Sequence, residues 1–352
     1  MFRPVALLSI VASLALAPSV PLQAAAAPAK TATAGYHVVK EIPLGGEGGW
    51  DYLTVDAAAR RLYVSHSTKV TVVDVDSGKT VGDVQNLSGV HGIALAGDLG
   101  RGFISNGRSS MVTIFDLKTL ATLSEVKSTG ENPDAILYDP PSSQVFAFNG
   151  RSHNATVLEA KTGKVVGTIE LGGKPEFATT DLKGRVFVNL EDRSEVAVIG
   201  AKDLAVKAHW PLKPCEEPSG MAIDRKHHRL LIGCANKLAA VVNTEGGKVV
   251  TTVPIGEGVD ANGFDPGTGL GFSSNGEGTL TVIREETPDR FTVVENVPTR
   301  RGARTMALDE KTHSVYLSTA QFGPAPAPTA EQPRPRPAIL PDTFTILVVS
   351  RQ

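Results

Sequence analysis

The chain repeats itself about every 42 residues, and this period constrains its fold more than any other feature. Gly97-Asp98 stands at the second position of the series. At the other positions a short apolar run ends in an aspartate: Asp56, Asp139, Asp181, Asp224, Asp265 and Asp309. This spacing is typical of a four-stranded propeller blade. Strands this short are unstable alone, so the units must stack to bury their faces.

Each unit reads as four short strands separated by polar turns. The first unit has its second strand at 61–65 and its third at 70–74, and a fourth strand is clear at 164–169. Abundant β-branched residues, Gly/Asp/Asn punctuation and the absence of a helical period predict strands throughout. We therefore predict an all-β fold over residues 36–350, a seven-bladed β-propeller with four-stranded antiparallel blades.

The two ends of the repeat region predict how the ring closes. The last unit has strands at 305–308, 314–318 and 343–349, but no fourth strand. The segment 37–45 matches 248–256, which is a fourth strand elsewhere in the series. We expect the N-terminal strand to complete the last blade, because this pairing removes an exposed sheet edge.

Residues 1–26 have the features of a secretory signal peptide. Arg3 precedes an apolar run at 5–17 that is too short to span a bilayer, and Ala24 and Ala26 occupy the small-residue positions before a cleavage site. Residues 27–35 would then form an N-terminal tail. This pattern predicts a periplasmic or secreted protein with no membrane span after signal removal; an uncleaved membrane anchor is the alternative.

The second and third strands resemble the YVTN-type repeats of bacterial YncE-like propellers. Leu-Tyr-Val-Ser-His at 62–66 and Val-Phe-Val-Asn at 186–189 are variants of the Tyr-Val-Thr-Asn core, and 162–166 and 196–199 match the parts that follow. The resemblance covers essentially the whole mature chain and implies a propeller. It does not imply a reaction, because propellers host unrelated activities.

The blade order sorts the loops onto two faces. One face carries short turns, whose Asp and Gly residues are explained by turn geometry. The other carries the residue just ahead of each inner strand, with His66 behind this ring. Sevenfold geometry places these residues around the mouth of the central channel: Asp51, His91, Asp134, Glu176, Ser219, Asp260 and Arg304.

Two interpretations of the polar face stay open. In the first it binds a ligand through Asp51, His66, His91, Asp134, Glu176, Asp260 and Arg304. The cofactor that these residues suggest is a divalent metal, with Asp51, His91, Glu176 and Asp260 as candidate ligands, or with His91 and His66 if it is a transition metal. In the second the face is a solvated polar rim. The same choice applies to the basic residues of this face, which either clamp an anion or are simply solvated: Arg108, Arg151, Arg300, Arg301 and Arg304.

Two further features fall on the same face. Cys215 and Cys234 flank a hairpin that would bring them together, so we expect a disulfide, with two free thiols as the alternative. Residues 322–342 interrupt the last unit and are rich in proline. We expect an extended loop there, which is either a lid or docking arm, or an insertion without a role.

No sequence motif identifies a catalytic residue. The chain lacks Gly-x-Ser-x-Gly, His-Glu-x-x-His, Cys-x-x-Cys and phosphate-loop patterns. A net charge of −2 gives no support for a nucleic-acid partner. We expect a monomeric, exported binding or interaction module of the cell envelope, whose partner is a small molecule or an envelope protein. The alternative is a metal-dependent, lactonase-like hydrolase that uses Asp51, Glu176, Asp260 and an asparagine on the same face.

Overall fold

The computed structural model describes residues 1–2, 4, 35–327, 329, 335 and 337–351. The predicted signal peptide (1–26) and tail (27–35) lie almost entirely outside these residues and stay predictions. All strands belong to one compact unit, residues 33–352. Helical structure in the described part consists of two single turns, η1 (Gly97–Leu99) and η2 (Glu191–Arg193), so it contains no helix that could cross a membrane.

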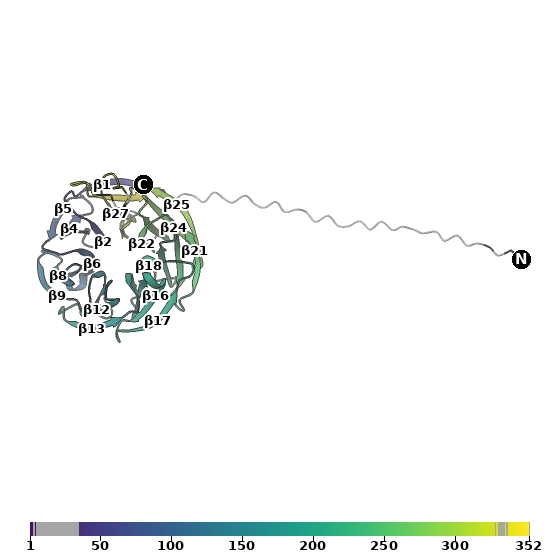
Figure 1. The fold of residues 1–352 in the computed structure, drawn as a ribbon, viewed down its shortest axis with the longest axis horizontal. Helices are drawn as coiled ribbons and strands as arrows, with labels where there is room; N and C mark the ends of the chain where they lie inside the picture. The colour runs from purple at the N-terminus through teal and green to yellow at the C-terminus, as the bar shows by residue number, and fades with distance from the viewer. Residues whose placement is uncertain (3, 5–34, 328, 330–334, 336, 352) are drawn as a thin grey trace. The chain divides into compact units, whose positions relative to one another are not determined.

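The strands form seven separate four-stranded antiparallel sheets, arranged as blades around a ring (Figure 1). Blade 1 consists of β2 (Trp50–Asp56), β3 (Arg61–His66), β4 (Lys69–Asp74) and β5 (Thr80–Val84). Blade 2 consists of β6 (Val90–Ala96), β7 (Arg101–Asn106), β8 (Met111–Asp116) and β9 (Thr122–Lys127). Blade 3 consists of β10 (Pro133–Asp139), β11 (Gln144–Asn149), β12 (Asn154–Glu159) and β13 (Val165–Glu170). Blade 4 consists of β14 (Pro175–Thr180), β15 (Arg185–Leu190), β16 (Glu195–Gly200) and β17 (Ala205–Pro211).

Blade 5 consists of β18 (Pro218–Asp224), β19 (Arg229–Cys234), β20 (Leu238–Asn243) and β21 (Val249–Pro254). Blade 6 consists of β22 (Val259–Asp265), β23 (Leu270–Asn275), β24 (Thr279–Thr287) and β25 (Arg290–Pro298). Blade 7 consists of β26 (Met306–Asp309), β27 (Ser314–Thr319), β28 (Thr345–Arg351) and the N-terminal strand β1 (Tyr36–Pro43).

The ring closes through β1, as predicted. This strand pairs antiparallel with β28, from Tyr36 opposite Arg351 to Pro43 opposite Thr345, and so supplies the missing outer strand (Figure 1). A second link crosses the seam at the turn face, where Arg60 Nη1 of blade 1 lies 2.6 Å from Oδ2 of the fully buried Asp309 of blade 7. The closure therefore combines backbone pairing with a buried ion pair.

The hydrophobic core lies between neighbouring blades. Tyr63 and Val72 of blade 1 pack with Ile104 and Phe115 of blade 2, and similar clusters fill the other interfaces. The seam between blades 7 and 1 is filled in the same way, with Phe344 among its members. Removing apolar surface from water contributes about 25 cal/mol per Å² to the free energy of folding. Because each blade buries its two faces against the blades on either side, its stability depends on both neighbours.

The aspartate that marks the repeat acts both within its blade and between blades. In blade 3, Oδ2 of Asp139 accepts a hydrogen bond from the backbone N–H of Ser142, which stabilises the turn. Its Oδ1 accepts a hydrogen bond from the Thr180 hydroxyl of blade 4 at 2.6 Å. Asp265 likewise accepts from Gly267 N within its blade and from His313 Nδ1 of blade 7. The sequence predicted the turn role, and the structure adds the link between blades.

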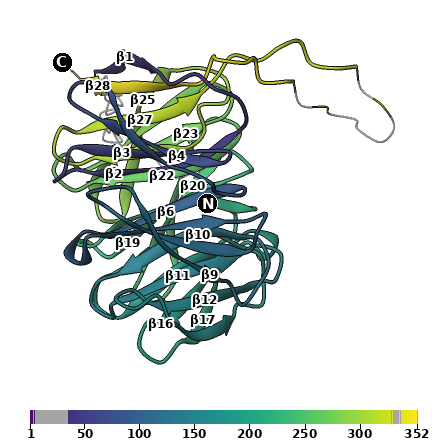
Figure 2. The same ribbon diagram turned by 90° about the vertical axis from the view of Figure 1, so that its left-hand side faces the viewer.

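The described parts of the proline-rich insertion extend away from blade 7 (Figure 2). Its two ends are tied together by an antiparallel bridge between Phe322 and Ile339, with Gly323 N donating to Ala338 O. The Phe322 ring lies 6.1 Å from that of Trp50, at the start of β2. The base of the insertion is thus packed beside the inner strand of blade 1.

Candidate ligand site at the channel mouth

Residues at or just ahead of the N-terminal ends of the seven inner strands meet around a cavity of about 330 Å³. All seven residues that the repeat placed at the channel mouth line it: Asp51, His91, Asp134, Glu176, Ser219, Asp260 and Arg304. The other lining residues are Tyr52, Lys174, Phe177, Glu191 and Thr305. The structure thus brings together residues that lie more than two hundred positions apart in the sequence.

A β-bulge aims most of these side chains. In blade 1, Trp50 pairs with His66 and Leu53 with Val64, so that Asp51 and Tyr52 together face one residue of β3. The same shift in register occurs at the start of β6, β10, β14, β18 and β22. A bulge of this kind adds one residue to the strand and turns its side chain. The same bulge therefore occurs in six blades, and each one directs a side chain into the cavity.

Hydrogen bonds from the preceding blade fix the backbone at several of the channel-mouth residues. The Ser105 hydroxyl of blade 2 donates to the carbonyl of Asp134 in blade 3. Asn189 Nδ2 of blade 4 donates to the carbonyl of Ser219 in blade 5 at 2.7 Å, and the Ser274 hydroxyl of blade 6 donates to the carbonyl of Arg304. The positions of the cavity residues are therefore set by neighbouring blades, and this feature was not evident from the sequence.

On one side of the cavity a histidine lies between two carboxylates. His91 Nδ1 lies 2.6 Å from Asp51 Oδ2, to which it donates, and 3.7 Å from Asp134 Oδ1. Burial on its own would lower the pKa of His91, but the hydrogen bond to Asp51 and the charge of Asp134 outweigh burial and raise the pKa to about 9. His91 is consequently a cation at neutral pH.

The other carboxylates of the cavity also have partners. Lys174 Nζ lies 2.8 Å from Glu176 Oε1 and also pairs with Glu191. Asp260 accepts a hydrogen bond from the Ser219 hydroxyl at 2.9 Å, and its Oδ2 lies 3.2 Å from Arg304 Nε. These pairings fix the positions of the charged side chains, but the carboxylates of the cavity still outnumber its cationic side chains.

Burial and mutual repulsion raise the pKa of three of the carboxyl groups in the cavity. Desolvation, helped by the charges of Asp51 and Asp260, raises the pKa of Asp134 to about 6. Desolvation and the charge of Asp134 raise the pKa of Glu176 to about 8 despite the nearby Lys174. Burial likewise raises the pKa of Asp260. Perturbed carboxyl groups gathered in one cavity mark it as a candidate functional site.

The structure separates His66 from this cavity. Its side chain is buried at the end of β3, and the ring packs 4.4 Å from that of Phe344 in blade 7. Burial lowers its pKa, so a neutral ring fills the seam between blades. The expected placement of His66 at the channel mouth is therefore wrong, and with it the idea that His66 and His91 share a transition metal.

The suggested metal ligands are only partly brought together. Among the described residues, the potential ligand atoms of Asp51, His91 and Asp134 all lie within 4.8 Å of one another. Glu176 and Asp260 are not members of that group, because they face Lys174 and Arg304. The four-residue set proposed from the sequence is thus replaced by a three-residue cluster.

The cavity also has an aromatic wall that sequence reasoning missed. The rings of Tyr52 and Phe177 stack with their centres 4.8 Å apart, although they come from blades 1 and 4. Each follows a channel-mouth residue directly, Asp51 or Glu176, on the same bulge. That adjacency was a signal available in the sequence.

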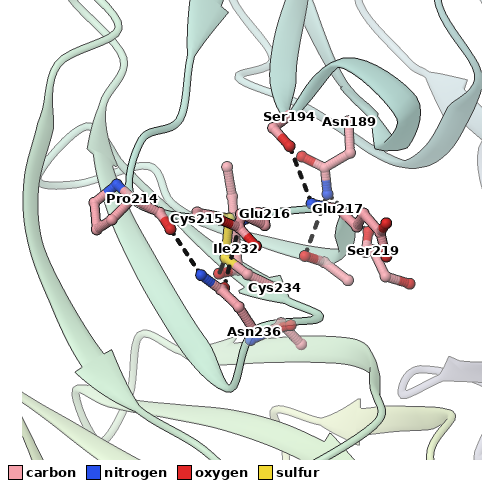
Figure 3. The surroundings of a disulfide bond; sticks show 12 residues. Asn189, Ser194, Pro214, Cys215, Glu216, Glu217, Ser219, Ile232, Cys234 and Asn236 are labelled. Carbon is pink, nitrogen blue, oxygen red and sulfur yellow. Dashed lines mark hydrogen bonds between the residues drawn. A yellow bond between two sulfur atoms is a disulfide. The ribbon is translucent and has the colours of Figure 1, made fainter.

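A disulfide fastens the link that leads into blade 5. The structure joins Cys215 to Cys234, with their Cα atoms 5.5 Å apart (Figure 3). Around it Asn236 Nδ2 donates to Pro214 O at 2.8 Å, and Glu217 N donates to the Ser194 hydroxyl. This network tethers the chain just ahead of β18 and hence near Ser219.

A second histidine between two carboxylates lies on the opposite, turn-bearing face. His227 Nδ1 is 2.7 Å from Asp224 Oδ2 within blade 5 and 2.9 Å from Glu285 Oε1 of blade 6. Burial and the charge of Asp224 raise the pKa of Glu285. The contacts span two blades, so this cluster is explained as another link between them.

Comparison with known proteins agrees on the architecture. A chain in a structure described as "Crystal structure of RRP9 WD40 repeats" matches with a TM-score of 0.73 and 9% identity over 91% of this chain and 99% of that one. "Structure of U3-55K" matches with a TM-score of 0.72 and 10% identity, over 90% and 99%. The fold is a seven-bladed β-propeller.

Two further structural neighbours are also distant in sequence. A chain of the "Crystal Structure of Mitotic Checkpoint Complex" matches with a TM-score of 0.71 and 14% identity over 93% of this chain and 99% of that one. "Kuenenia stuttgartiensis Hydrazine Synthase" matches at 0.66 and 15%, over 83% and 94%. No protein-family model and no curated protein matches the chain. At such identities the likeness concerns the fold alone, because unrelated functions share this architecture.

Proposed function

We propose that this propeller is an exported binding module of the bacterial cell envelope, related to the YVTN-type propellers, whose channel-mouth cavity takes a small cationic ligand. The family is supported by the Tyr-Val-Thr-Asn-like strands at 62–66 and 186–189. Export is supported by the signal-like residues 1–26, and a disulfide is consistent with an oxidising compartment.

The excess of buried negative charge carries the proposal on ligand class. Five carboxylates line the cavity against three cationic side chains, His91, Lys174 and Arg304. Repulsion and burial raise the pKa of Asp134 and Glu176, which means that ionising them costs free energy in the empty cavity. A bound cation would recover part of that cost, so the site favours positive charge.

The aromatic wall of the cavity restricts the class of ligand further. Tyr52 and Phe177 contribute ring surfaces to a cavity whose other lining residues are mostly polar. Organic ammonium groups are attracted both to carboxylates and to aromatic faces. A volume of about 330 Å³ suits a small molecule better than a protein segment.

Isothermal titration calorimetry with putrescine and with calcium chloride tests this function. We expect saturable binding of one of the two at pH 8, where Asp134 is ionised and Glu176 is about half ionised. Asp260→Asn should weaken it roughly tenfold, because hydrogen bonds to charged groups contribute about 1.5–3 kcal/mol. Glu216→Gln, an exposed carboxylate outside the cavity, is the matched control. Binding of neither cation, or equal binding by both variants, would refute the proposal.

The three-residue cluster favours a second candidate, a metal-dependent hydrolase of lactonase type. Asp51, His91 and Asp134 are chemically suited to a divalent metal, which would polarise a substrate carbonyl when bound. This candidate ranks second, since His91 Nδ1 already donates to Asp51 and a pKa of about 9 makes the metal compete with a proton.

Elemental analysis of protein purified without chelator separates the two candidates. A stoichiometric divalent metal that is lost in His91→Ala, together with hydrolysis of a lactone panel, would favour the hydrolase. Protein without such a metal, with stability unchanged by chelator and no lactone hydrolysis, would leave the binding module.

A further inference from the structure

A second and larger cavity lies next to the acidic one, over blades 1 to 3. Its volume is about 920 Å³, and it shares Asp51 and His91 with the channel-mouth cavity. Its lining is otherwise different and consists mostly of glycine, serine and threonine residues, together with Arg108, Lys127 and Arg151. The same face of the propeller therefore carries an acidic cavity and a separate basic groove.

Two copies of one loop supply the arginines of this groove. Blades 2 and 3 both have the sequence Asn-Gly-Arg-Ser where the second strand ends, at 106–109 and 149–152. None of the other five blades has this sequence at the corresponding position. The duplication places Arg108 and Arg151 at equivalent positions of adjacent blades.

The backbone of both loops is fixed in the same way. Gly107 N donates to Gly89 O at 2.8 Å, and Gly150 N donates to Asn132 O at 2.9 Å, so each loop is tied to the link that precedes its own blade. A Cβ added at Gly107 would lie 2.6 Å from Asn132 Oδ1 and 2.6 Å from His91 Nε2, so a larger residue there would have to displace these side chains. The two arginines thus lie on loops that are held by equivalent backbone hydrogen bonds.

Among the described residues, the arginine and lysine side chains of the groove make no ion pairs that would stabilise the fold. On the turn face Arg60, Arg185 and Arg229 all pair with carboxylates. Within the described residues, by contrast, no ion pair or side-chain hydrogen bond engages Arg108, Lys127 or Arg151.

The carboxylates of the groove do not neutralise these cations. Two carboxylates line it, and one of them, Asp51, is already paired with His91. That leaves Glu131 against the three free cations.

We propose that the duplicated Asn-Gly-Arg-Ser loops form a binding site for an oxyanion, the carboxylate or phosphate group of a small molecule. A guanidinium presents its N–H donors in a fixed fork that matches both groups, and two such forks from adjacent blades converge on one groove. The Ser109 and Ser152 side chains of the same loops lie beside them as additional hydrogen-bonding groups. This site goes beyond the proposed cation site, although the two cavities adjoin.

The test is calorimetric titration of the purified chain with sodium citrate and with sodium phosphate, at constant ionic strength. We expect saturable one-to-one binding of at least one anion. The double variant Arg108→Gln/Arg151→Gln should weaken it roughly a hundredfold, about tenfold for each charged hydrogen-bonding partner removed. The control is Arg290→Gln, an exposed arginine at the turn between β24 and β25, which should bind like the unaltered chain.

The two probes also distinguish the source of the anion, because preference for citrate indicates a carboxylate ligand and preference for phosphate a phosphorylated one. Lack of saturable binding by both anions, or equal affinity in the double variant, would overturn the proposal. The thermal unfolding midpoint of the double variant shows that it is folded, since both arginines are exposed. Failure here would leave the cation experiment with Asp260→Asn unaffected, so the two proposals can fail separately.

Discussion

Replacing Glu176 by glutamine should make the protein more stable while weakening its cation site. Glu176 is largely buried, with 16% of its side chain exposed, and Asp134 repels it. Glutamine has nearly the same shape and needs no ionisation. Lys174 keeps Glu191 as a partner in this variant. The substitution therefore removes a repulsive charge without leaving a buried cation alone.

The expected gain follows from the displaced pKa. Folding raises the pKa of Glu176 from 4.5 to about 8, so the folded state holds the proton more tightly than the unfolded state. The contribution of Glu176 to stability is therefore largest below pH 4.5 and is lost as the pH rises towards 8. At 1.36 kcal/mol per pH unit the loss at pH 7 is at most about 3 kcal/mol. Because the cavity is open to water, we expect about 1–2 kcal/mol.

Urea unfolding at pH 5, 7 and 9 measures this effect. Glu176→Gln should raise the free energy of unfolding at pH 7 and 9, and its stability should fall less between pH 5 and 9. Glu216→Gln, an exposed carboxylate away from the cavity, should behave like the unaltered chain. The reasoning would be refuted if Glu176→Gln were less stable at pH 9, or if its stability fell as steeply with pH.

Three more perturbations address other parts of the structure. The His91 resonance should titrate by NMR with a pKa of about 9, and Asp51→Asn should lower that value by at least about one unit; a pKa near 6.5 in the unaltered chain would contradict the geometry. The same raised pKa means that stability contributed by His91 is present below pH 6.5 and lost as the pH rises through 9, a loss that Asp51→Asn should reduce. Replacing both Cys215 and Cys234 by alanine should lower the free energy of unfolding by about 2–4 kcal/mol, whereas an unchanged urea midpoint would mean that the disulfide adds nothing. Arg60→Ala should cost about 3 kcal/mol in the same assay, because it leaves a fully buried aspartate of blade 7 unpaired, and a loss below about 1 kcal/mol would argue against that pairing.

Much of the architecture was predictable because it depends on period and turn chemistry. The spacing of the aspartates set the number of blades, and the orphan strand at 37–45 set the closure that β1 makes with β28. Counting back from each inner strand located the residues from Asp51 to Arg304 that line the cavity. This worked because one repeated backbone carries equivalent positions to equivalent places.

The errors concern contacts between blades, which no repeat unit encodes alone. His66 was placed at the channel mouth, but the packing of Phe344 from the far end of the chain draws it into a seam. Lys174 lies outside the repeat position that defines the ring, yet it pairs with Glu176 and Glu191 and alters the charge of the cavity. Such contacts depend on side-chain directions that vary from blade to blade.

By itself the sequence determined seven stacked blades, the strand that closes them and the face on which polar residues gather, since these follow from local periodicity. Only the tertiary structure decided which charges meet. It paired His91 with Asp51, buried Glu176 beside Asp134, and left Arg108 and Arg151 free in a separate groove. The reason is that ionisation and pairing depend on distances of a few ångströms between blades and on the exclusion of water, and both arise only when the ring is closed.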